Sequence, residues 1–153
     1  MTFLAGLLVP RIWVTKKERR DFEQTNFQNT TKLIEQHDQT YGEYTKAISA
    51  YAATPDDTNA FVEIATKGDR YLYQLNLLAA AILSDKVDQQ VRDEVLLPKV
   101  RSAATETLPD HYSTLAAIAE KHGLTYSGEL KRSNYGAIFA VAEKYKDVQA
   151  WSC

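Results

Sequence analysis

Residues 27–51, FQNTTKLIEQHDQTYGEYTKAISAY, carry the pattern that decides the fold. Apolar and semi-polar side chains recur here in steps that alternate between three and four residues, which places them along one stripe of an α-helix. The stripe consists of Phe27, Thr30, Ile34, His37, Tyr41, Tyr44, Ile48 and Tyr51. Charged and amide side chains fill the positions between them, as on the solvent side of a helix. The pattern predicts a long first helix over residues 16–53.

The same stepping returns after residues 54–57, TPDD, which resemble a helix start. A hydroxyl at the N-cap, a proline at the first helical position and carboxylates in the first turn each favour it. The second stripe consists of Phe61, Ile64, Gly68, Tyr71, Leu75, Leu78 and Ile82. Residues 75–83, LNLLAAAIL, are apolar on more than one side, so we expect this helix to be the most buried. Gly68 indicates a close approach of another helix, with a local kink as the alternative.

Three further helical stretches follow a break at Ser84 and Asp85. The first, over residues 88–107, contains Pro98, which should bend or interrupt it. The next opens at Pro109, places His111 on the surface of its first turn and closes at His122 and Gly123. The last is expected after Ser133, with Ile138, Val141, Ala142, Tyr145 and Val148 as its apolar positions.

The predicted fold is all-α: an up-and-down helical bundle of four main helices, the third kinked or split at Pro98, plus a short apolar N-terminal segment. No stretch alternates as a strand would, so no sheet is expected. A chain of 153 residues can bury one core, so we assign residues 16–153 to a single bundle domain and residues 1–15 to the apolar segment.

The first twenty residues, MTFLAGLLVPRIWVTKKERR, join an apolar run to a basic cluster. A signal peptide would carry its positive charge first, and a complete membrane span needs about 20 apolar residues, so neither fits. Two main interpretations remain open: the end of a membrane span or an anchor at a membrane interface, or a segment that packs on the bundle or on a second copy. A disordered end is the third. Either contact would involve Phe3, Leu4, Leu7, Leu8, Trp13, Lys16, Lys17, Arg19 and Arg20.

The net charge of −2 is unevenly distributed, because residues 1–20 carry five basic side chains and one acidic side chain. The remaining chain is therefore mildly acidic and has no electrostatic reason to bind nucleic acid. Anionic lipid headgroups suit the basic cluster better. The single cysteine, Cys153, is compatible with a reducing compartment. We therefore expect a cytoplasmic protein, with the inner face of a membrane as the alternative location.

Catalytic and metal-binding motifs are not found in the sequence. A di-iron bundle needs Glu-x-x-His pairs, and none of His37, His111 and His122 has a glutamate three residues before it. No Gly-x-Ser-x-Gly turn or phosphate-binding glycine loop is present. We therefore expect no metal, no cofactor and no enzymatic activity.

His37 and three tyrosines are the candidate ligand-binding residues. His37 lies within the first stripe together with Tyr41 and Tyr44, and Tyr71 lies in the second. They would line a pocket for a small ligand between the first two helices, since tyrosine offers both an apolar ring and a hydroxyl. The structural alternative is a buried histidine that is hydrogen-bonded to a tyrosine, with the other tyrosines at the edge of the core.

These observations favour a non-enzymatic helical bundle that acts through protein–protein contact. Association with a membrane through the N-terminal segment is compatible with this function. Polar positions within a long heptad-like stripe often specify a partner, so we expect a homo-oligomer, most simply a homodimer through the first helix, or a complex with another protein. The alternative function is a small-ligand sensor.

Overall fold

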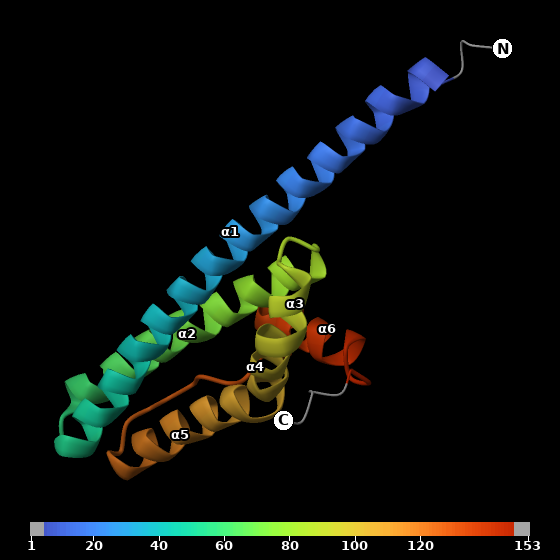
Figure 1. The fold of residues 1–153 in the computed structure, drawn as a ribbon. Helices are drawn as coiled ribbons and strands as arrows, with labels where there is room; N and C mark the ends of the chain where they lie inside the picture. Colours follow the sequence, from blue (N-terminus) through green and yellow to red (C-terminus); the bar gives the residue numbers. More distant parts are fainter. Residues whose placement is uncertain (1–4, 149–153) are drawn as a thin grey trace.

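The computed structural model describes the backbone of residues 5–148 and the side chains of residues 16–148. Within these ranges the fold is all-α, as predicted, and contains no strand (Figure 1). The α-helices are α1 Ala5–Ala53, α2 Thr58–Leu83, α3 Gln89–Val91, α4 Leu97–Ser102, α5 Leu108–Lys121 and α6 Gly136–Lys144. Two π-helical turns, η1 Arg92–Leu96 and η2 Ala103–Thr107, and one 3-10 turn, η3 Arg132–Tyr135, complete the helical elements.

Helix α2 is the centre of the bundle, as its apolar composition predicts. It forms an antiparallel hairpin with α1 and also packs against α5 and α6 (Figure 1). Leu72, Leu75, Leu78 and Ile82 are at most 1% exposed, so its apolar stripe is fully covered.

Helix α1 extends far beyond its partner. Its 49 residues span about 74 Å at 1.5 Å per residue, whereas the 26 residues of α2 span about 39 Å. The N-terminal part of α1 therefore projects past the end of α2 (Figure 1). The sequence pattern predicts a start at residue 16, whereas α1 starts at Ala5 and continues through Pro10.

Half of the positions predicted for the buried stripe of α1 are correct. At the other half, the buried or half-buried residue is the one that precedes the predicted residue in the sequence. Thr30, His37, Tyr44 and Tyr51 face α2 or the core as expected. The intervening buried or half-buried positions are Asn26, Leu33, Thr40 and Ala47. Phe27, Tyr41 and Ile48, which the sequence pattern assigned to this stripe, are instead 57%, 49% and 42% exposed.

Hydrogen bonds to the turn after α2 explain this shift. The Asn26 side chain donates to the carbonyls of Asp85 and Val87 at 3.2 and 3.3 Å. The backbone N–H of Asp88 donates to the Thr30 hydroxyl at 2.8 Å. Buried backbone groups need such partners, so Asn26 rather than Phe27 faces the turn.

The chain from α3 to α5 is one bent helical run, in which each proline follows a π-helical turn. The N–H of Leu97 bonds to the carbonyl of Arg92, and that of Leu108 bonds to Ala103. A wider π turn makes room for the proline ring, which would clash in an α-helix. The expected distortion at Pro98 is therefore present, whereas Pro109 continues the run instead of opening a separate helix.

The helix ends agree with the sequence only in part. Asp57, not Thr54, caps α2, because its carboxylate accepts from the Asn59 N–H at 2.9 Å. Gly123 follows α5 with a φ of +64°, as predicted. Ser133 lies inside η3 rather than capping α6, and Val148 lies beyond the end of α6.

Candidate functional site: an aromatic groove between α1 and α5

The main candidate site is a groove of about 590 Å³ that opens between α1 and α5, with α2 as its floor. It is lined by Tyr41, Tyr44, Ile48, Tyr51, Ile64, Tyr71, Glu106, Thr107, Asp110, His111, Thr114 and Ile118. The groove exists because α1 packs chiefly on α2, which leaves the side of α1 toward α5 open.

Two tyrosine–histidine hydrogen bonds connect α1 to α5 along the groove. The Tyr44 hydroxyl lies 2.8 Å from Nδ1 of His111, and the Tyr51 hydroxyl lies 2.9 Å from Nε2 of His122. Both helices therefore run in the same direction along the groove, with Tyr51 and His122 at one end. The groove end with Tyr41 lies near the start of α5.

Tyr71 is the centre of an aromatic cluster beneath the groove. Its ring centroid lies 5.4 Å from that of Tyr41, 5.7 Å from Tyr44 and 5.5 Å from His37. Burial is the main cause that raises the pKa of Tyr71 to about 12, with Tyr41 and Tyr44 adding to it. Tyr71 therefore remains a neutral phenol at physiological pH and contributes an amphipathic surface.

His111 is buried beneath the groove, and the expectation of a surface position is wrong. It is 2% exposed and stands over Gly68, where a side chain would overlap its ring. Gly68 thus allows the close approach of α5 to α2 that the sequence indicates. Burial lowers the pKa of His111, although the carboxylate of Asp69 opposes this effect. Its Nε2 has no hydrogen-bond partner among the described residues, since the nearest Asp69 oxygen is 3.6 Å away.

The charged side chains that line the groove are both acidic. Glu106 and Asp110 line it from the start of α5, and the lining contains no lysine or arginine. Asp110 adds to the effect of burial in raising the pKa of Tyr44. This end of the groove therefore favours a positively charged group, whose attraction to tyrosine faces would add to that of the carboxylates.

The four predicted ligand-binding residues lie close together in the structure, but only three of them line the groove. Tyr41, Tyr44 and Tyr71 share the groove, which opens toward α5 rather than between the first two helices. His37 lies behind them, 4% exposed, with Nδ1 at 2.8 Å from an Asp38 carboxylate oxygen. Its partner is thus an aspartate, not the expected tyrosine.

Sequence reasoning missed His111, Glu106 and Asp110, which come from a distant part of the chain. The available signal was Gly68, which indicated that another element approaches α2 closely. Gly68 did not indicate which helix approaches α2, because the spacing of residues along one helix does not identify the helices that pack against it.

The predicted membrane or interface residues fall into two groups. Phe3, Leu4, Leu7, Leu8 and Trp13 lie outside the residues whose side chains are described, so that expectation stays a prediction. Lys16, Lys17 and Arg20 are exposed on α1. Arg19 pairs with Glu23 at 2.9 Å, and both side chains remain largely in solvent.

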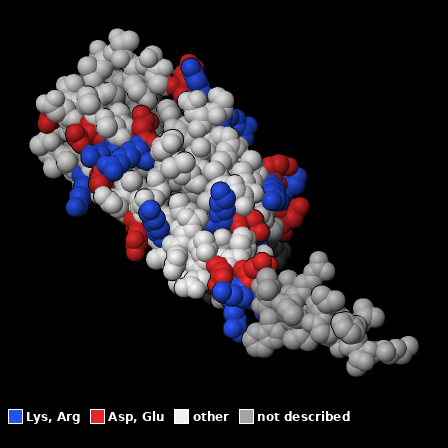
Figure 2. All heavy atoms as spheres, turned by 90° about the horizontal axis from the view of Figure 1, so that it is seen from above, with Lys and Arg blue, Asp and Glu red and all other residues white. Residues whose placement is uncertain are grey.

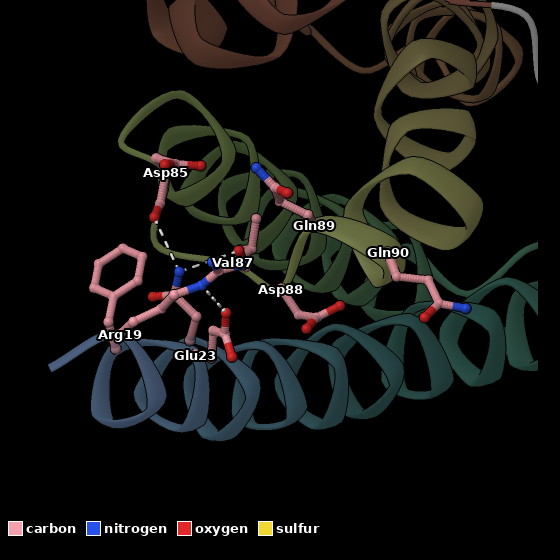
Figure 3. Close-up of a pocket in the computed structure, with 9 residues that line it drawn as sticks. Arg19, Glu23, Asp85, Val87, Asp88, Gln89 and Gln90 are labelled. Carbon is pink, nitrogen blue, oxygen red and sulfur yellow. Dashed lines mark hydrogen bonds and ion pairs between the residues drawn. The ribbon is translucent and has the colours of Figure 1, made fainter. Parts of the chain in front are cut away.

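A second pocket, of about 430 Å³, lies where α1 leaves the bundle (Figure 3). Arg19 and Glu23 rise from α1 toward Asp85, Asp88 and Gln89 of the turn after α2. Several of its polar groups bond to one another: Arg19 donates to Glu23 at 2.9 Å, and the Asn26 side chain donates to the carbonyls of Asp85 and Val87. We therefore interpret this pocket as part of the contact that fixes the turn on α1.

Neither a membrane span nor a metal cluster is found in the part of the chain that the structure describes. Comparisons with models of protein families, with curated proteins and with solved structures gave no match.

Proposed function

We propose that the protein is a helical assembly module that self-associates through an uncovered face of α1. The observation that carries this proposal is a row of large side chains at every seventh residue of α1 that the bundle covers only in part: Ile34 packs against the core, and the Tyr41 ring lies 5.4 Å from that of Tyr71. The row consists of Phe27, Ile34, Tyr41 and Ile48, of which Phe27, Tyr41 and Ile48 are each more than 40% exposed.

This row belongs to a complete second heptad register. Together with Thr31, Asp38, Thr45 and Ala52 it repeats in steps of four and three, one residue out of phase with the stripe that packs on α2. A helix with two adjacent registers is suited to contact two other helices, one along each. Since α2 covers the first, a further helix would bury the second. That burial would stabilise the complex through the hydrophobic effect.

A second copy of the chain supplies a helix of the required length. The part of α1 that projects beyond α2 is about 35 Å long, and a partner's projecting part would cover the exposed row over a similar length. The contact would then be the same on both chains, as in a two-fold dimer.

The mass of the native particle tests this proposal. A dimer of the 17.3 kDa chain is expected by light scattering, and Phe27→Ser should raise the dimer dissociation constant about tenfold or more, because it removes a large apolar contact. Tyr73→Ser is the matched control, since Tyr73 is 60% exposed on α2 and lies outside the row. A wild-type monomer at high protein concentration would contradict the proposal.

The groove favours a second candidate function, the binding of a small amphipathic ligand. Its volume of about 590 Å³ lies within the usual range for ligand sites, and tyrosine rings with two carboxylates suit an organic cation. A thermal-shift screen of aromatic amines should find a ligand whose stabilisation is reduced in Tyr71→Phe and lost in Glu106→Gln with Asp110→Asn. A screen without any stabilising amine would count against it.

A further inference from the structure

The second register of α1 also constrains how two copies would pair. We infer that two α1 helices pair antiparallel over their whole length, with Ala5 of one opposite Ala53 of the other; this inference rests on the proposed self-association.

The length and the register independently select the same alignment. Full overlap of two helices that run from Ala5 to Ala53 maximises the buried face. In antiparallel coiled coils the two core positions of the heptad face each other across the interface, so the row with Phe27 must face the partner's row with Thr31. Full overlap brings Phe27 opposite the partner's Thr31, and Gln24 opposite the partner's Ile34. An alignment shifted by one heptad, about seven residues, would keep the core positions facing each other but shorten the overlap, and smaller shifts would lose both.

Complementary charges also meet in this alignment. Arg20 lies opposite the partner's Asp38, and both side chains are exposed in the single chain. The Asp38 side chain is 63% exposed, although one of its oxygens bonds to His37, so it can accept a second donor. Because of the two-fold symmetry, this pair occurs twice. Figure 2 shows lysine and arginine side chains, with acidic neighbours, where the described part of α1 meets the grey N-terminal residues.

The basic cluster then reaches the acidic end of the groove. Lys17 lies opposite the partner's Tyr41, whose ring accepts a cation, and Lys16 is its neighbour. Tyr41 lines the groove end at which Glu106 and Asp110 stand. Asp21 lies near the partner's Glu35, a like-charge pair at the edge of the interface that limits the affinity.

The two bundles do not compete for space in this arrangement. Each bundle packs along the C-terminal half of its own α1, and antiparallel pairing places the two bundles at opposite ends of the paired helices (Figure 1). The projecting half of each α1 then covers the open side of the other bundle.

Charge reversal tests the pairing of Arg20 with the partner's Asp38. In sedimentation equilibrium, Arg20→Glu and Asp38→Arg alone should each raise the dimer dissociation constant about tenfold, because each creates two like-charge contacts. The double variant should return to within about threefold of wild type. Lys32→Glu is the matched control, because Lys32 is exposed on another face of α1. A double variant as weak as the single ones would overturn this pairing.

Disulfide trapping tests the direction of the helices separately. Two chains, Gln24→Cys and Ile34→Cys, each also carry Cys153→Ser and are mixed before mild oxidation. The antiparallel alignment predicts a disulfide between unlike chains, because like positions lie about 15 Å apart along the helix axis. Disulfides within each chain type alone would indicate a parallel dimer and overturn the inference, while the self-association itself would remain supported. A monomer in light scattering would instead refute the proposed function.

Discussion

Gly68 and His111 illustrate how one residue type determines a helix contact. The imidazole of His111 occupies the space that a side chain at position 68 would fill, so α5 approaches α2 only because residue 68 is glycine. The same imidazole is hydrogen-bonded to Tyr44 of α1. Three helices therefore meet at this ring.

Gly68→Ala is expected to destabilise the fold by about 1–3 kcal/mol, because the added methyl overlaps the His111 ring in a packed core. Urea denaturation measures the change in the free energy of unfolding. Gly42→Ala is the control: its new methyl would meet no atom within 4 Å, and alanine in a helix interior should stabilise by about 0.5–1 kcal/mol. Equal effects at the two positions would refute this account of the contact.

The burial of His111 predicts a pH dependence of stability. Its pKa is lowered in the folded chain, chiefly by burial, so the unfolded chain takes up a proton more readily. Above the unfolded pKa of about 6.5 both states are neutral, and the contribution of His111 does not change. As the pH falls below that value, the free energy of unfolding should decrease. Tyr44 and Asp69 are the polar groups that face the ring.

Denaturation at a series of pH values, in wild type and in His111→Gln, tests this dependence. The decrease between about pH 7 and pH 5 should be smaller in the variant, because glutamine does not titrate. The same pH slope in both proteins would show that other groups cause it.

At the scale of single elements, the helix starts and the bends follow from local chemistry. Asp57 accepts the Asn59 N–H and so satisfies one of the free donors at the start of α2. Pro98 and Pro109 each follow a π-helical turn, so the helical run bends at these sites without ending. Both features depend on a few neighbouring residues.

Asp57→Ala should lower the free energy of unfolding by about 1 kcal/mol, because α2 loses its cap. Asp56→Ala is the matched control, since no capping bond from Asp56 is found in the described residues and its substitution should change stability little. Thermal denaturation by circular dichroism measures both. A larger loss at position 56 would indicate that the cap has been assigned to the wrong residue.

At the scale of the whole molecule, the main feature is the open side of α1. The helix projects beyond the bundle and presents a second register that the rest of the described chain covers only in part. This arrangement is costly for an isolated chain, because large apolar side chains remain in water. This uncovered apolar surface is why we propose that a partner completes the packing of α1.

Amide hydrogen exchange as a function of concentration tests this at the same scale. The amides of residues 16–25 should exchange faster at nanomolar concentration than at high micromolar concentration, because only the dimer covers the projecting part of α1. The amides of Leu72 and Leu75 in the core of α2 serve as the reference and should change far less. Exchange of residues 16–25 that is independent of concentration would contradict the self-association.

The helical class of the fold follows from the sequence alone, because the spacing of apolar residues reports which side chains share a face of the same helix. The stripe of α2, its burial, the meaning of Gly68 and the distortion near Pro98 were all predictable in this way. Tyr41, Tyr44 and Tyr71 were identified as a group because they lie on the two most regular stripes.

Only the tertiary structure decided between the two registers of α1. Both fit the spacing, and the choice depends on hydrogen bonds from Asn26 and Thr30 to a turn that lies far along the chain. The burial of His111 and the position of Glu106 and Asp110 beside the tyrosines depend in the same way on how α5 crosses α2. Spacing within a helix is a local property, whereas the identity of the neighbour is settled by the packing of the whole chain.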